Sequence, residues 1–242
     1  MANAAADPAA GGPMIAIVID DMGVDRQRSA RAIALAAPLT MAFLPYADDL
    51  PSQAAAARRR GHELLVHLPM EPEGPADPGP GALLLRLSEA ENMSRLRAAL
   101  TRFPGFVGVN NHMGSRFTRN AEAMWPLLTE LRDRGLMFLD SRTSPQSVGY
   151  GLALEAGMAA AQRDVFLDNE GSFADVRENL ARTEQVARER GSAIAIGHPR
   201  DATLAALEPW LADMRARGFV AVPLTAVVKR RIFMAERRER SR

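Results

Sequence analysis

The stretch MIAIVI at residues 14–19 decides the fold class, because it is a continuous apolar run that is rich in β-branched side chains. Such a run is typical of a strand that is buried on both faces. Two acidic residues, Asp20 and Asp21, follow it, and a helical pattern covers residues 25–37. A buried strand with a polar end and a following helix predicts the first unit of a parallel β/α fold.

The same alternation continues along the chain. Further strands are predicted over residues 40–44, 63–67, 105–110, 137–139, 164–167, 193–196 and 219–223. Helices are predicted over residues 50–60, 88–102, 120–134, 152–161, 173–190 and 203–217, the second of them starting at a capping box of Ser88 and Glu91. Seven or eight mostly parallel strands in 242 residues predict a distorted (β/α) barrel, with an open doubly wound sheet as the alternative.

One domain is predicted, over residues 14–228. Residues 1–13 are expected to be a linker or a disordered segment, because they lack the basic start and apolar centre of a signal peptide. Residues 229–242 form a basic tail, which we expect to be a solvated helix, with a contact to an anionic surface as the alternative. No apolar run reaches the ~18 residues of a transmembrane helix.

Composition excludes several classes of function. The formal net charge of +1 gives no general electrostatic reason to bind nucleic acid. The absence of cysteine rules out disulfides, thiolate metal ligands and a cysteine nucleophile, and it is compatible with an oxidising compartment. The chain also lacks the GxSxG, GxGxxG and P-loop motifs.

Polar residues recur where the predicted strands end. They are Asp20, Asp21, His67, His112, Asp140, Asp168 and His198. The carboxyl ends of parallel strands meet on one rim of a barrel, so these side chains are expected to converge there. Two imidazoles and a carboxylate suit a catalytic zinc ion, because they leave one of its coordination positions open for a water molecule. A second carboxylate can then take a proton from that bound water. Taken singly, each acid could instead cap a helix or turn, and each histidine could be a buried structural residue.

These segments together resemble the divergent polysaccharide deacetylase family, a branch of the NodB-type carbohydrate esterases. The matching segments are IAIVIDDMG (15–23), GHELLVHLPMEP (61–72), GVNNHMGSRFT (108–118), FLDSRTS (138–144), VFLDN (165–169) and AIAIGHP (193–199). The resemblance implies a NodB-like distorted barrel, a zinc-type site, a carbohydrate polymer as substrate and a periplasmic or secreted location.

The resemblance also implies roles for single residues. Asp20 corresponds to the catalytic base, Asp21 and His67 to metal ligands, and His198 to the general acid, which Asp140 or Asp168 would orient. The second histidine of the family's metal motif falls on Glu71, so either His112 or Glu71 must complete the metal site, and we favour His112. The family's Arg-x-Pro-Tyr segment is missing, and Asn110 and Asn111 stand in its region; with Ser115 they are expected to bind substrate.

The expected function is hydrolysis of an acetyl amide or ester on a polysaccharide or cell-wall glycan. The departures from the family pattern leave a second reading open, in which the chain is a non-catalytic glycan-binding or envelope protein with a degenerate site. Hydrolysis of another small amide or ester is a third reading.

Overall fold

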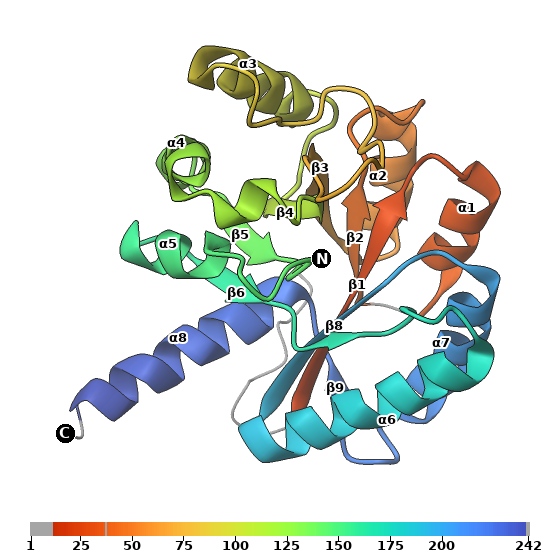
Figure 1. Ribbon diagram of the computed structural model, residues 1–242. Coiled ribbons are helices and arrows are strands. Elements are labelled where there is room, and N and C mark those ends of the chain that lie inside the picture. The colour runs from red at the N-terminus through yellow and green to blue at the C-terminus, as the bar shows by residue number, and fades with distance from the viewer. Residues whose placement is uncertain (1–11, 37, 241–242) are drawn as a thin grey trace.

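The computed structural model describes residues 12–36 and 38–240, and these form a curled parallel sheet surrounded by helices (Figure 1). The strands are β1 (Met14–Met22), β2 (Thr40–Phe43), β3 (Glu63–Met70), β4 (Gly108–Met113), β5 (Met137–Asp140), β6 (Ala160–Gln162), β7 (Val165–Phe166), β8 (Ser192–Gly197) and β9 (Val220–Ala221). Their order in the sheet is β6-β5-β4-β3-β2-β1-β8-β7, with β9 pairing to β1.

The helices follow the strands in the alternation that the sequence predicts. They are α1 (Arg26–Ala34), α2 (Leu50–Arg59), α3 (Glu89–Leu100), α4 (Ala121–Asp133), α5 (Gly149–Glu155), α6 (Phe173–Arg190), α7 (Asp201–Asp213) and α8 (Leu224–Arg240), with a 3-10 turn at Phe117–Arg119. Helix α3 starts with the predicted capping box, in which Ser88 and Glu91 bond each other's backbone amides.

A single stretch of chain, residues 160–166, joins the two edges of the sheet. Its first half is β6, which pairs with β5, and its second half is β7, which pairs with β8. Between them, the Arg163 amide donates to Asp140 O at 3.0 Å and the Asp164 amide donates to Ile194 O at 2.9 Å. Because one segment bonds to both edges, the sheet curls into the distorted NodB-like barrel that was predicted and does not stay open as a doubly wound sheet.

The helix predicted over residues 152–161 is present as α5, but its predicted end is wrong by six residues. Helix α5 ends at Glu155, Gly157 turns the chain with φ of 71°, and Ala160 already belongs to β6. Alanine favours helix by itself, but pairing with β5 decides the conformation here.

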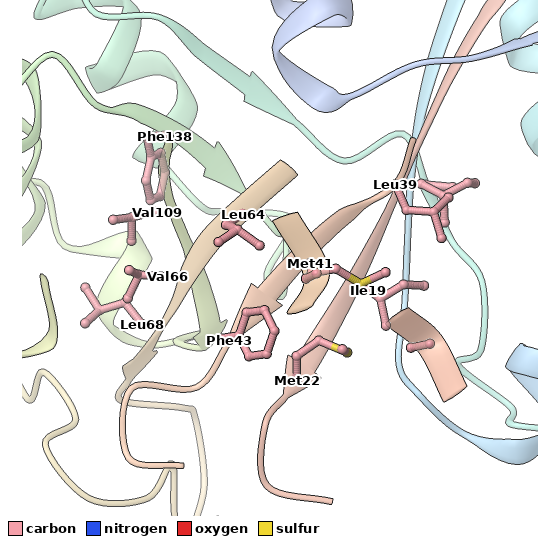
Figure 2. Close-up of a cluster of buried hydrophobic side chains, with 14 of the residues drawn as sticks. Ile19, Met22, Leu39, Met41, Phe43, Leu64, Val66, Leu68, Val109 and Phe138 are labelled. Carbon is pink, nitrogen blue, oxygen red and sulfur yellow. The ribbon is translucent and has the colours of Figure 1, made fainter. Parts of the chain in front are cut away.

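Alternate residues of the strands face two separate cores. In β1, Ile15, Ile17 and Ile19 pack outward against the helices, whereas Ala16 and Val18 belong to a second cluster inside the barrel. Figure 2 shows part of the outer cluster, with Met41 and Phe43 of β2 beside residues of β1 and β3. This two-residue period fixes which side chains face the barrel interior and, at the carboxyl ends of the strands, the site.

Helix α8 closes the amino-terminal end of the barrel interior. Its residues Leu224, Val227 and Val228 are buried in the inner cluster, and the half-buried carboxylate of Glu63 accepts hydrogen bonds from the Thr225 amide and hydroxyl. The predicted limit between barrel and tail, at residue 228, therefore falls inside a helix whose first turns belong to the core. The later turns extend away from the barrel (Figure 1).

Two predictions concern segments outside this core. Residues 1–11 of the predicted linker and residues 241–242 of the predicted tail lie outside the described residues. Within residues 12–36 and 38–240, no helix combines the length and the hydropathy that crossing a membrane requires.

Candidate metal centre

The polar side chains of the site continue the inward-facing rows of the barrel. Asp20 follows Ala16 and Val18 in the two-residue period of β1, and His67 follows Leu65 in β3. On the remaining strands, the inward positions near the carboxyl end are those of Asn110, His112, Asp168 and His198. Strands β1, β3 and β4 each run three residues beyond their predicted ends, so the candidate residues of these strands lie within the strands, where His67 is opposite Asn110 and His112 is opposite Pro69.

Asp21 reaches the same place through a distortion of β1. In the pairing of β1 with β2, Ile19 lies opposite Met41 and Met22 lies opposite Phe43, so β1 has one extra residue, a β-bulge. Asp21 has a left-handed backbone with φ of 55°, which costs a residue other than glycine about 1–3 kcal/mol. The distortion that brings this side chain into the site lies at Asp21 itself, before Met22 resumes the pairing with β2.

Three side chains converge as a metal-binding set. Asp21 Oδ1 lies 2.8 Å from His112 Nδ1 and 3.3 Å from His67 Nε2, and the two imidazole nitrogens are 3.2 Å apart. Donors of a tetrahedral zinc ion, each about 2.0–2.1 Å from the metal, lie about 3.3–3.4 Å from each other. The observed triangle is close to that size. Among the described residues, this trio is the group with metal-binding geometry.

Asp21 Oδ1 gives a second reason to assign a cation to this position. It is buried and has no hydrogen-bond partner, although two imidazole nitrogens lie within 3.3 Å of it. A buried carboxylate oxygen without a hydrogen-bond partner is costly unless a cation satisfies it, so the residues fit a divalent metal.

Asp20 lies beside this trio on the inner wall. It is 3% exposed, its Oδ1 accepts a 2.8 Å hydrogen bond from Asn110 Nδ2, and its Oδ2 is 3.6 Å from His67 Nε2. Burial raises the pKa of Asp20 above its ordinary value, and this effect exceeds the opposing influence of His67, His198 and the Asn110 hydrogen bond. A buried carboxyl with a raised pKa is suited to accept a proton.

His198 and Asp168 form a dyad beside β1, at the ends of the neighbouring strands β8 and β7. His198 Nδ1 lies 2.9 Å from Asp168 Oδ1, and Nε2 is turned toward the trio, 3.7 Å from Asp21 Oδ2. Asp168 Oδ2 also accepts hydrogen bonds from the His198 amide and from Thr203 Oγ1, each at 2.7 Å. Burial would lower the pKa of His198, but the hydrogen bond and the charge of Asp168 raise it, so the imidazolium form is favoured.

Asp140 is not part of this dyad. Its Oδ2 accepts from Ser147 Oγ at 2.7 Å and from the Tyr150 amide at 3.1 Å, and its Oδ1 accepts from the Arg142 amide at 2.9 Å. In β5 the inward residues are Met137 and Leu139, so Asp140 faces outward and fixes the loop before α5. Of the two acids that were expected to orient His198, the structure places only Asp168 in contact with it.

Glu71, the alternative metal ligand, is held outside the trio. Its Oε1 bonds Arg116 at 2.9 Å and its Oε2 bonds the Leu85 amide at 2.5 Å. This leaves His112 as the third member of the set. Ser115 is half-buried on the adjacent loop, where its hydroxyl accepts from the Glu73 amide at 2.8 Å.

The two asparagines predicted to bind substrate are both completely buried. Asn111 bonds the Met113 carbonyl, the Ser141 amide and Thr143 Oγ1, and Asn110 bonds other side chains of the site. Neither side chain has surface left for a substrate, because the sheet neighbours of β4 enclose them; the prediction of direct substrate contact is corrected accordingly.

Two contributors to the site were missed from the sequence. Thr203, in the first turn of α7, bonds Asp168, and Phe166 of β7 meets the His198 ring edge-on with centroids 5.5 Å apart. Phe166 comes two residues before Asp168, so it shares the inward side of the strand, and that spacing was a usable signal. The contact from Thr203 had no such signal. The fourth histidine, His62, lies before β3 and away from the site, and it is buried between the Leu39 amide and the Ile33 carbonyl.

Comparisons with known proteins identify relatives of the chain and structures that share its fold. The chain is 37% identical over 200 residues to an uncharacterized protein of Haemophilus influenzae, covering 83% of this chain and 71% of that one. It is 36% identical over 194 residues to the uncharacterized protein YibQ of Escherichia coli, covering 80% of this chain but only 61% of the relative. The crystal structure of the uncharacterized protein ATU2773 from Agrobacterium tumefaciens superposes with a TM-score of 0.88 at 32% identity over 90% of both chains.

More distant structures share the fold. The catalytic domain of a peptidoglycan N-acetylglucosamine deacetylase from Eubacterium rectale has a TM-score of 0.55 at 15% identity, covering 90% of this chain and 94% of that domain. BA3943 of Bacillus anthracis, a CE4 family pseudoenzyme, has a TM-score of 0.56 at 12% identity, covering 90% of this chain and 66% of that one. A family profile described as divergent polysaccharide deacetylase matches residues 17–228. The chain therefore belongs to the divergent polysaccharide deacetylase family.

Proposed function

We propose that the protein is a metal-dependent hydrolase that removes acetyl groups from an acetylated polysaccharide or cell-wall glycan. The observation that carries the proposal is the unpartnered, buried Oδ1 of Asp21 between the imidazole nitrogens of His67 and His112, with Asp20 and His198 on either side. Family membership supports the substrate class.

The roles of the residues follow from their positions. Asp21, His67 and His112 would hold a divalent ion, and we propose zinc because two nitrogen donors and one carboxylate are its usual catalytic ligands. When bound, that ion polarises the acyl carbonyl and lowers the pKa of a water molecule. Asp20 would accept a proton at Oδ2, which faces His67 Nε2 while Oδ1 is occupied by Asn110.

His198 would supply the other proton transfer. Asp168 stabilises its imidazolium form through Nδ1, so Nε2 can donate a proton to the leaving nitrogen or oxygen. Asp20 and His198 would thus divide the base and acid work between a buried carboxyl group and a charge-stabilised imidazole. Ser115, on the loop beside His112, remains proposed as a substrate contact.

A non-catalytic glycan-binding protein is the second candidate. The observation that favours it is Glu71, which replaces the family's second motif histidine and is engaged with Arg116 and the Leu85 amide. We also propose, from the family resemblance, that the protein acts in the periplasm or outside the cell. Fractionation of cells expressing the complete gene product tests this, and a purely cytosolic pool would refute it.

Metal analysis followed by an acetate-release assay tests the main proposal. Purified protein is loaded with zinc, and acetate release is measured from N-acetylated chitooligosaccharide and from peptidoglycan. The expected result is one zinc per chain and release that stops when a chelator removes the metal. A zinc-loaded protein that binds glycan and releases no acetate, while Asp20→Asn binds it equally well, would support the non-catalytic candidate.

A further inference from the structure

Asn110 lies at the junction of the candidate base and a candidate metal ligand. It is the inward residue of β4 directly opposite His67 of β3, and it is 0% exposed. Its Oδ1 lies 2.9 Å from His67 Nδ1, and its Nδ2 lies 2.8 Å from Asp20 Oδ1 and 3.2 Å from Ser141 Oγ. One side-chain amide therefore bonds residues of two other strands, β1 and β3, and the residue that follows β5.

The chemistry of these neighbours fixes which way the amide points. An ionised Asp20 has only acceptor atoms, so the NH2 end of Asn110 must face it, and the reverse orientation would set two oxygens against each other. The Oδ1 end then faces His67 and can only accept. His67 must consequently carry its proton on Nδ1, which leaves the lone pair of Nε2 directed toward Asp21 and His112.

We infer that Asn110 is a positioning residue that couples the base to the metal centre. Through Oδ1 it selects the tautomer in which His67 can bind a metal, and through Nδ2 it holds Asp20 with Oδ2 free for proton transfer. The inference rests on the proposed function, since it assigns a partner to both a proposed ligand and the proposed base. Hydrogen bonds to metal-bound imidazoles commonly change metal affinity by about 10–100-fold.

Two substitutions separate the two halves of this role. Asn110→Ala removes the bonds to His67 and Asp20 together with the bond to Ser141, so we expect the dissociation constant for zinc to rise about 10–100-fold. Asn110→Asp has the same shape and keeps the oxygen that accepts from His67 Nδ1, so zinc affinity should be retained. It replaces the donor to Asp20 with a second negative charge, so acetate release should fall by about 10²-fold or more.

Asn111→Ala is the matched control. Asn111 is the neighbouring residue, of the same type and equally buried, but its partners are Met113, Ser141 and Thr143 and none of the metal-binding trio. Removing it should lower the temperature of thermal unfolding without changing zinc affinity. A purely structural role for Asn110 would give the same result for both alanine variants.

Zinc affinity is measured by competition with a chromophoric chelator, which requires no substrate. If Asn110→Ala binds zinc as tightly as the wild type, or Asn110→Asp loses zinc as Asn110→Ala does, the inference is overturned while the proposed metal site stands. A wild type that binds no zinc overturns the proposed function itself. Should Asn110→Ala fail to fold, the isosteric Asn110→Asp decides: retained zinc with lost turnover supports the coupling, and retained zinc with wild-type turnover refutes it.

Discussion

Replacement of His112 by alanine gives the most direct test of the metal centre. Structural zinc bound by four protein ligands contributes about 10–16 kcal/mol, so one ligand accounts for about 3 kcal/mol, or a factor of about 10² in Kd. His112 Nδ1 is 2.8 Å from Asp21 Oδ1 and completes the triangle with His67. Because the His112 side chain is 12% exposed, a water molecule can enter the position that the imidazole vacates. The loss of zinc-binding free energy is therefore limited to about 3 kcal/mol.

Thermal unfolding with and without zinc measures the effect. With zinc about 100-fold above the wild-type Kd, binding stabilises the wild type by about 2.7 kcal/mol, whereas the variant gains about 0.4 kcal/mol. For a chain of this length, 1 kcal/mol corresponds to about 2–4 °C in Tm. The expected shift on adding zinc is therefore about 5–11 °C for the wild type and about 1 °C for His112→Ala.

Two variants serve as controls for this experiment. His62→Gln removes the histidine that lies away from the trio and bonds Leu39 and Ile33, so its shift on adding zinc should match that of the wild type. Glu71→Ala should also keep the full shift. The reasoning fails if His112→Ala keeps the wild-type shift, and a loss confined to Glu71→Ala would make Glu71 the third ligand.

Three further outcomes are expected. Asp20→Asn should keep its zinc but lose about 10²–10⁴-fold in the rate of acetate release, and a rate near that of the wild type would exclude Asp20 as the base. Asp168→Asn should move the alkaline limb of the pH–rate profile to lower pH, because Asp168 raises the pKa of His198, whose protonated form is required; an unmoved limb would separate Asp168 from the proton donor. His62 has a pKa that burial lowers below its unfolded value of about 6.5, so the folded state binds its proton less well and stability is lost as the pH falls below ~6.5. Chemical unfolding of wild type and His62→Gln at pH 7.5 and 5.5 should show that the wild type loses more stability over this interval, and equal losses would contradict the assignment.

The sequence by itself determined the fold class and most of the site. Apolar strand runs that alternate with helical patterns specify a parallel β/α barrel, because both signals are local and repeat along the chain. Polar residues at the carboxyl ends of such strands meet on one rim, so a polar site at that rim followed from their positions, whereas the choice of Asp21, His67 and His112 as metal ligands came from the family resemblance. The distinction between Asp140 and Asp168 did not follow from that rule.

Only the tertiary structure decided which of these residues face inward. Strands of a parallel barrel are apolar on both faces, so Ile15 and Ala16 look alike until the helices and the interior are in place. The bulge at Asp21 depends on pairing with β2, and β6 forms where Ala160 pairs with β5. Strand pairing joins residues that are distant in the chain. A local sequence pattern therefore does not determine the register of a strand pair or the position of a bulge in it.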